Sequence, residues 1–317
     1  MKAYLIRRLA TALVLLWVVA SVVFFSIYVL PGDPAHVILG GMDANPTPEQ
    51  LRAVREKLGL DRPAVTRYVE WLTHAIRGDF ARSLITDRPV AADLLVRLGR
   101  TLQLIVPAIT IAVAVGVPTG VFAARRRGTV YDPLASAVTL LGFSVPVFVV
   151  GPMLVYVFAL WLRVLPSGGY VHPMEQPTAY LTYLVMPALA LAAGPMATTM
   201  RMARSAVLEQ LPLDYVRTAR SKGLADPSVL GRHVLRNALL PVLTIVGLQV
   251  GAMFAGSVIV EAIFNWPGMN AFLLQAIGVR DYPVIQAIVF TASGLFITIN
   301  FMTDVGYAVL DPRIRYA

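Results

Sequence analysis

Six long apolar runs, separated by polar segments, dominate the hydropathy pattern of the chain. Each run can cross a bilayer as a helix, because about 20 apolar residues span the hydrocarbon core. The first contains 22 residues and leads into Pro31-Gly-Asp-Pro34 rather than a small-residue cleavage site, so we expect an uncleaved span and not a signal peptide. The expected spans cover residues 9–30, 101–124, 134–162, 179–200, 239–263 and 283–309.

The third run carries two prolines, Pro146 and Pro152. Proline removes a backbone donor and clashes with the preceding helical turn, so this span is expected to kink or tilt. Six spans place both termini on the same side of the membrane. The fold class predicted is therefore an all-α integral membrane protein.

A polar stretch, residues 31–100, separates the first span from the second and contains 10 Lys/Arg and 9 Asp/Glu. Two amphipathic helices are predicted in it, one over residues 51–58 that ends at Gly59 and one over residues 63–77. We interpret the stretch as a small helical subdomain outside the cell. The apolar stripe of the second helix is expected to contain Val65, Tyr68, Val69, Leu72 and Ile76.

The basic residues indicate the orientation. If the N-terminus is cytoplasmic, that side holds 15 of the 27 Lys and Arg residues, while the short external loops carry only Arg163 and Arg280. The positive-inside rule therefore predicts cytoplasmic termini. The domains expected are residues 1–30 as the first span, 31–100 as the external subdomain, and 101–317 as a five-span domain with a cytoplasmic loop at 201–241.

That loop is the only charge-dense segment between the apolar runs of the C-terminal half, and it is predicted to form helix, turn and helix. Gly223 suits a left-handed helix stop, and Asp226 followed by Pro227 suits an N-cap and a first helical position. Tyr215, Ala219 and Gly223 fall on one face at i, i+4 and i+8. This pairing of one ring with two small residues is expected to let another protein approach closely.

Composition excludes several classes of protein. The mean hydropathy of +0.69 and a charged fraction of 14% do not suit a soluble domain, which averages about 25% charged residues. The net charge is +9, and the basic residues behind it lie in patches beside the apolar runs, so membrane orientation explains them better than nucleic-acid binding does. The chain has no cysteine, no phosphate-binding Gly-x-x-x-x-Gly-Lys-Ser/Thr motif and no His-Glu-x-x-His motif. We therefore expect no enzyme activity, metal or cofactor in this chain, and energy must come from a partner or an ion gradient.

Within the membrane, four residues are candidates for the pathway or for helix packing. Gly247 and Gly251 form a Gly-x-x-x-Gly pattern, which suits either helix packing inside the subunit or a pathway-lining helix. Asp304 lies one turn after Asn300 near the inner end of the last span. An intramembrane carboxylate costs roughly 2.5–3.5 kcal/mol, so Asp304 is either a structural pair or a proton carrier.

A mixed aromatic turn, Glu261-Ala-Ile-Phe-Asn-Trp-Pro-Gly268, follows the fifth span. Glu261 is expected in the external interface. Phe264 and Trp266 suit either a lipid-facing aromatic belt or a short re-entrant segment at the outer face.

Taken together, these motifs resemble the permease subunit of ATP-binding-cassette importers of the dipeptide, oligopeptide and nickel group. The family marks the cytoplasmic loop with Glu-Ala-Ala, a later Gly and a Leu-Pro pair. Here Arg217 stands at the Glu position, and the Leu-Pro pair is displaced to Leu240-Pro241. The form typical of the peptide subgroup is present as Asp-Tyr-Val-Arg-Thr-Ala-Arg-Ser-Lys-Gly at residues 214–223. Further matching segments are 30–34, 58–61, 78–83, 165–170, 261–268, 280–283 and 311–316.

The resemblance implies a type I importer permease in the cell membrane that works with a second homologous permease, two ATPase subunits that bind ATP and Mg²⁺, and an extracytoplasmic solute-binding protein. It places Phe264 and Trp266 near the outer mouth. Family members carry dipeptides, longer peptides, nickel chelates or haem, and the sequence does not choose among them. The residues that it implies for ATPase coupling are Asp214, Tyr215, Arg217, Thr218, Ala219, Arg220, Lys222 and Gly223.

An alternative class remains open on the residues alone. An ion-gradient-driven transporter or channel would act without ATPase subunits, with Asp304 as its working residue. A requirement for separate ATPase subunits distinguishes the two classes.

Overall fold

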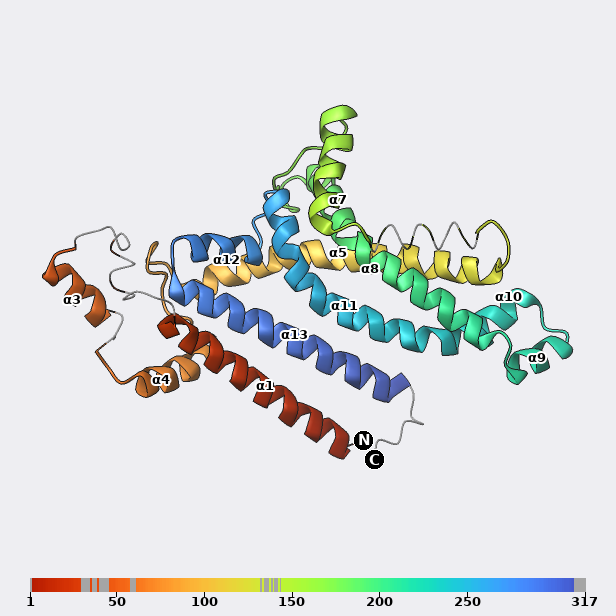
Figure 1. The fold of residues 1–317 in the computed structure, drawn as a ribbon, viewed down its shortest axis with the longest axis horizontal. Coiled ribbons are helices and arrows are strands. Elements are labelled where there is room, and N and C mark those ends of the chain that lie inside the picture. The colour runs from red at the N-terminus through yellow and green to blue at the C-terminus, as the bar shows by residue number, and fades with distance from the viewer. Residues whose placement is uncertain are drawn as a thin grey trace. The chain divides into compact units, whose positions relative to one another are not determined.

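The structure is a computed structural model that describes residues 2–29, 46–57, 61–131 and 144–310, with positions 35, 39, 133, 137, 139 and 142. The matching segments at 30–34 and 311–316 and the helix end at Gly59 lie outside these residues. The described residues are helical apart from turns and one isolated bridge between Arg82 and Pro89. The predicted all-α fold is confirmed (Figure 1).

Among the described residues, five helices are long and apolar enough to cross a membrane, and they correspond to five of the six predicted spans. The remaining predicted span, 134–162, is represented among the described residues by a shorter helix, so the count of six stays a prediction. The elements are α1 (Lys2–Val29), α3 (Pro48–Lys57), α4 (Ala64–Ile76), α5 (Val90–Arg125), α7 (Val147–Leu154), η1 (Val155–Trp161), α8 (Pro177–Gln210), α9 (Asp214–Ser221), α10 (Asp226–Ser228), η2 (Val229–Val234), α11 (Leu235–Ile263), α12 (Met269–Gly278) and α13 (Tyr282–Leu310).

Proline has different effects in these helices. Pro146 stands at the N-cap of α7, so the chain starts a new helix there instead of kinking a continuous one, whereas Pro152 lies inside α7 just before the π-helical η1. Pro152 has no N–H to donate to the preceding turn, so a regular helical hydrogen bond is absent there. Pro241 lies inside α11, so the helix that follows the polar loop continues without a break into the predicted fifth span. Membrane helices tolerate such prolines because neighbouring groups satisfy the freed carbonyls.

The chain forms two compact units, residues 1–5, 101–267 and 299–317 in the first and residues 6–100 and 268–298 in the second. In the first unit α8 packs along α11, and α7 packs on both (Figure 1). Helix α8 has 34 residues, which at about 1.5 Å per residue is about 51 Å and exceeds the roughly 30 Å hydrocarbon core. It ends at Gln210, ten residues beyond the predicted span end at Met200.

Two glycines bring α5 against α8. A Cβ atom at Gly120 would lie 2.4 Å from the Met200 carbonyl oxygen, and one at Gly116 would lie 2.8 Å from that of Met196. Gly116 and Gly120 form a Gly-x-x-x-Gly pattern, which allows such close helix approach. This contact was not singled out from the sequence, although the spacing is visible there.

In the second unit α4 packs on α1. The Tyr68 ring lies 5.4 Å from the rings of Phe24 and Phe25, and Trp71 lies 5.6 Å from Phe24. The Tyr68 hydroxyl is 2.7 Å from the Ser21 hydroxyl. Helix α4 matches the predicted 63–77, but the predicted stripe is wrong in part: Val65, Val69 and Ile76 are exposed, and Trp71 and Ala75 contribute to the packed side. Because α4 packs on the aromatic residues of α1, its buried face is shifted by about one residue from the predicted aliphatic stripe.

The first amphipathic helix of the polar stretch, α3, begins at Pro48, three residues before the predicted start. Thr47 caps it, because its hydroxyl accepts from the Gln50 N–H at 3.3 Å and the Gln50 side chain accepts from the Thr47 N–H at 2.9 Å. This reciprocal pair is a capping box, a signal that the sequence carried in Thr47-x-x-Gln50.

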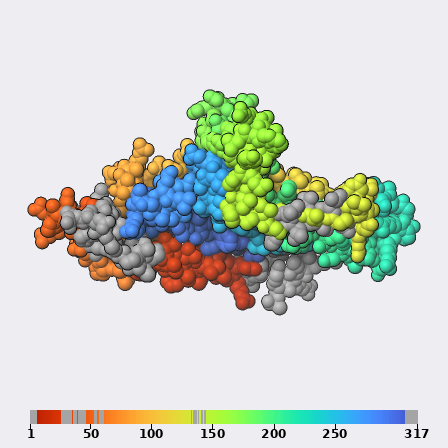
Figure 2. Space-filling view, turned by 45° about the horizontal axis from the view of Figure 1, so that its top comes forward, coloured from red at the N-terminus to blue at the C-terminus, as the bar shows by residue number. Residues whose placement is uncertain are grey.

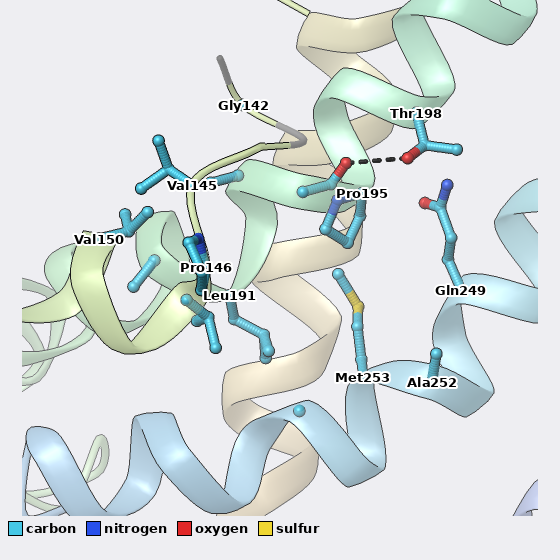
Figure 3. A pocket seen from close by; sticks show the side chains of 15 residues that line it. Gly142, Val145, Pro146, Val150, Leu191, Pro195, Thr198, Gln249, Ala252 and Met253 are labelled. Carbon is cyan, nitrogen blue, oxygen red and sulfur yellow. Dashed lines mark hydrogen bonds between the residues drawn. The ribbon is translucent and has the colours of Figure 1, made fainter. Parts of the chain in front are cut away.

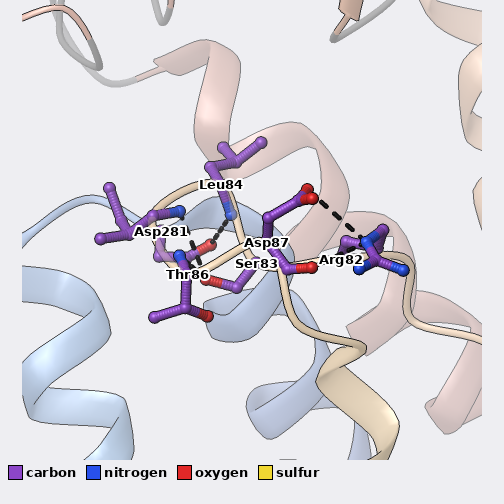
Figure 4. Close-up of polar contacts among 7 residues, drawn as sticks. Arg82, Ser83, Leu84, Thr86, Asp87 and Asp281 are labelled. Carbon is purple, nitrogen blue, oxygen red and sulfur yellow. Dashed lines mark hydrogen bonds and ion pairs between the residues drawn. The ribbon is translucent and has the colours of Figure 1, made fainter.

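The 78–83 segment forms an ordered turn after α4. The Asp79 carboxylate accepts from the Ala81 N–H at 3.1 Å and lies 3.0 Å from His74 Nδ1. The hydrogen bond from Ala81 and the contact with His74 lower the pKa of Asp79. The turn ends at Ser83, which is buried against Asp281 (Figure 4).

Candidate functional site

Helix α9 is the centre of the predicted coupling loop, and it ends as the sequence predicted. Gly223 has φ +77°, its N–H donates to the Arg220 carbonyl at 2.9 Å, and the Leu224 N–H donates to the Ala219 carbonyl at 3.4 Å. These two bonds form a Schellman motif, which needs a left-handed residue at the glycine position. The prediction that Gly223 stops the helix is confirmed.

The start of the next helix differs from the prediction. Asp226 is the first residue of α10 and not its N-cap, which is Ala225. The Asp226 carboxylate lies 3.3 Å from Arg220 Nε, so its oxygen pairs across the turn with α9 instead of capping its own helix. The pair links the two helices that flank Gly223.

The inner face of α9 is buried against the chain itself. Val216 and Ala219 are almost fully buried, with Tyr215 half-buried beside them and its hydroxyl donating to Gln210 at 2.8 Å. The prediction that the face of Tyr215, Ala219 and Gly223 is open to another protein is therefore wrong for Ala219. The physical reason is that this short helix also needs cover for Val216, and the ends of α5, α8 and α11 supply it. The cluster comprises Ala124, Ala206, Val207, Val216, Ala219, Val229, Val234 and Ala238.

The outer face of α9 is exposed, and Figure 2 shows its segment, in turquoise, at the molecular surface. Asp214 and Arg217 form an exposed ion pair at 3.6 Å. Nothing lies within 4 Å of a Cβ atom built at Gly223, so this glycine is needed for its conformation and not for close packing. The outer face comprises Leu213, Asp214, Arg217, Thr218, Ser221, Lys222 and Leu224.

A second candidate region joins two segments that the sequence treated separately, the 165–170 loop and the turn after α11. The Gly169 N–H donates to the Phe264 carbonyl at 2.7 Å, and a Cβ atom at Gly168 would lie 2.5 Å from the same oxygen. Trp266 is fully buried, with its ring 5.0 Å from the Tyr170 ring in an edge-to-face contact. Phe264 is also buried, so a lipid-facing aromatic belt at Phe264 and Trp266 is ruled out.

Glu261 lies beneath this turn. Its side chain is fully buried within the protein and accepts a hydrogen bond from the Thr101 hydroxyl at 2.7 Å. A buried carboxylate needs such partners, because an unpaired one is strongly destabilising. Glu261 also accepts through its main chain from the Trp266 N–H at 2.9 Å, which closes the turn.

The membrane candidates take part in packing. Gly247 lies against Thr303 of α13, where an added Cβ would be 2.3 Å from the threonine hydroxyl, and Gly251 is buried. Gly247 thus serves helix packing inside the chain, the first of its two interpretations. Asn300 and Asp304 are half-buried one turn apart, and Asp304 interacts with another group of the protein. Among the residues that the structure describes, no group of three or more His, Asp or Glu could hold a metal ion.

A cavity of about 370 Å³, which we did not predict from the sequence, lies between α7, α8 and α11 (Figure 3). Small residues make up much of its lining, among them Ala190, Gly194, Ala252 and Gly256. Two polar side chains reach it, Thr198 from α8 and Gln249 from α11. Signals for such a cavity exist only as scattered glycines and alanines, which also suit helix packing.

Comparison with known families decides what this arrangement belongs to. The model for "Binding-protein-dependent transport system inner membrane component" matches residues 116–316, and "Binding-prot-dependent transport system membrane comp, N-term" matches residues 1–106. The chain belongs to this permease family. It is accordingly a multi-pass protein of the cell membrane, and it is the permease subunit of an ABC importer. This confirms the resemblance and favours it over an ion-driven transporter.

Relatives of the permease match over its whole length. It is 38% identical over 316 residues to the probable peptide ABC transporter permease y4tP of Sinorhizobium fredii, with all of both chains covered. It is 39% identical over 318 residues to a putative peptide permease of Brucella suis, with 99% of each chain covered. It is 38% identical over 317 residues to the glutathione transport permease GsiC of Escherichia coli, again with full coverage of both.

A solved structure supports the fold. The inward-facing MetNI methionine ABC transporter matches with a TM-score of 0.53 at 16% identity, covering 69% of this chain and 96% of that one. At this identity the likeness concerns the fold alone. It agrees with the helical arrangement of the permease.

Proposed function

We propose that this permease carries short peptides, or solutes built on peptide bonds, across the cell membrane. The observation that carries the proposal is the identity of 38–39% over at least 99% of the chain to proteins named as peptide permeases. The relative named for glutathione, itself a small peptide, extends the same class of cargo. The permease would form half of the pathway with a second homologous permease subunit.

Energy enters through two ATPase subunits, because the chain itself has no phosphate-binding loop. Their contact on this subunit is the outer face of α9, which is exposed and carries Arg217 and Lys222 with the apolar Leu213 and Leu224 at its ends. Such a mixture of charged and apolar exposed side chains suits a protein interface. An extracytoplasmic binding protein delivers the cargo at the opposite side.

The two faces of α9 account for transmission. The outer face is free to bind an ATPase, while the inner face is held by residues from α5, α8 and α11, among them Ala124, Val207 and Ala238. A displacement of α9 therefore moves the ends of these helices, since a packed cluster does not deform continuously. Helices α8 and α11 also line the cavity, so closure of the ATPase subunits would change its shape.

The test is uptake by proteoliposomes that contain the whole complex, with loaded binding protein supplied on the outer side and ATP enclosed. Labelled di- to pentapeptides should accumulate only with hydrolysable ATP. A collapse of ion gradients by ionophores should leave the initial rate unchanged. Uptake without ATPase subunits, or ATP-driven uptake of a metal chelate with no peptide among the transported ligands, would overturn the proposal.

A further inference from the structure

Gln249 lines the cavity between α7, α8 and α11 and carries a polar group that the described residues leave unused. The Nε2 atom of Gln249 is buried and has no hydrogen-bond partner among the residues that the structure describes. Its Oε1 atom accepts from the Thr199 hydroxyl at 3.3 Å, so one end of the carboxamide is anchored to α8. A buried donor without a partner costs about 1–3 kcal/mol, and such a group in a native protein needs a reason.

The cavity is also kept open by the absence of side chains. A Cβ atom at Gly194 would have no atom within 4 Å, and one at Gly256 would meet only Leu191 Cδ1 at 3.7 Å. Larger residues therefore fit at these positions without a backbone clash, yet the space is unfilled. Its volume of about 370 Å³ lies within the range of ligand pockets, roughly 300–1,000 Å³.

The chemistry of the lining fits one class of ligand. Among the described lining residues none is charged, and the polar side chains are Thr198 and Gln249 (Figure 3). The Thr198 hydroxyl donates to the Gly194 carbonyl at 3.1 Å, which leaves its oxygen as an acceptor. The Gln249 amide is a donor. A peptide unit has one C=O acceptor and one N–H donor, which is the complementary set.

We infer that Gln249 donates to a main-chain carbonyl of the peptide during its passage, with the Thr198 hydroxyl as acceptor for the adjoining N–H. This contact rests on the proposed peptide cargo and specifies how it is recognised. It reads the backbone and not the side chains, so it serves peptides of different sequence. The apolar walls around it make each such hydrogen bond stronger than in water.

The experiment compares Gln249→Leu with the wild type in proteoliposomes of the whole complex, for a tripeptide and for its depsipeptide analogue, in which an ester replaces one amide. Leucine removes the unpaired amide but also the oxygen that accepts from Thr199, so folding and assembly of the variant are verified before uptake is compared. Uptake of the tripeptide should fall about tenfold, in line with the loss of one hydrogen bond in a buried site. The wild type should carry the analogue more poorly still, because the ester weakens the carbonyl that Gln249 binds and removes the N–H that Thr198 accepts. The variant should lose less on this change of cargo than the wild type does, because its contact with the carbonyl is already absent.

Two variants control this test. Gln275→Leu makes the same substitution at an exposed position of α12 outside the lining and should leave uptake unchanged. Gly194→Leu fills the cavity and should impair uptake while ATPase stimulation by loaded binding protein persists. Equal uptake by Gln249→Leu and the wild type overturns the inference. A second test places a benzophenone photocrosslinker at Ala252, which lines the cavity. If it crosslinks only to the second permease subunit and never to the transported peptide, the inference is also overturned. A wild-type complex that carries no peptide refutes the proposed function itself.

Discussion

The Ser83 hydroxyl donates a 2.5 Å hydrogen bond to the Asp281 carboxylate, joining residues nearly two hundred positions apart (Figure 4). The other carboxylate oxygen accepts from the Leu84 N–H at 3.1 Å, and both side chains are almost fully buried. The contact joins segments 78–83 and 280–283, two separate stretches of the sequence that resemble the permease family. It fixes the loop before α5 to the turn before α13.

Removal of this carboxylate should destabilise the second unit. Asp281→Ala leaves the Ser83 hydroxyl and the Leu84 N–H without their acceptor, at an expected cost of about 1–3 kcal/mol. Asp281→Asn should be milder, because the amide oxygen still accepts. The measurement is thermal unfolding of the purified complex in detergent. As a control, Asp87→Asn weakens an exposed pair with Arg82 and should change stability little. Equal stability of Asp281→Ala and wild type would contradict the assignment.

The crossing of α5 and α8 predicts intolerance at Gly120. Even Gly120→Ala places a methyl group 2.4 Å from the Met200 carbonyl oxygen, so the helices must separate. We expect lower yield of folded permease in the membrane and a lower melting temperature. Gly99→Ala in the same helix meets no atom within 4 Å and should be neutral or stabilising by up to about 1 kcal/mol. A Gly120→Ala permease as stable as Gly99→Ala would show that the crossing is looser than described.

The inner face of α9 predicts an effect on the permease alone. Ala219→Trp forces a large ring into the cluster around Val216, and overpacking typically costs about 1–3 kcal/mol. The isolated permease should therefore unfold at a lower temperature even without ATPase subunits. Unchanged unfolding, with loss only of ATPase binding, would indicate that Ala219 faces outward after all.

The orientation rests on charge and has its own test. A reporter fused after Ser221 should be active only in the cytoplasm, and one fused after Asp61 only outside, since 15 of the 27 basic residues lie on the predicted inner side. The reverse pattern would invert the roles assigned to α9 and to the polar stretch between α1 and α5.

Local signals predicted most of the fold. Apolar length located five long helices, and the glycine at 223 located the end of α9, because both depend on short stretches of chain. The side to which a short helix turns depends on distant partners. Val216 and Ala219 turn inward because α5 and α8 end, and α11 begins, beside them, and Trp266 is buried because the 165–170 loop folds over it. The Gln249 cavity was beyond prediction for the same reason, since it exists only where three helices meet.

We propose that the outer face of α9 transmits the work of the ATPase subunits to the membrane helices. The most direct measurement is ATPase activity of the reconstituted complex, with and without loaded binding protein, in the wild type and in Ser221→Trp. Ser221 is exposed on that face, so the ring should not disturb the permease fold. We expect a stable permease that has lost both the stimulation of ATP hydrolysis and peptide uptake. Full stimulation and uptake in Ser221→Trp would contradict it.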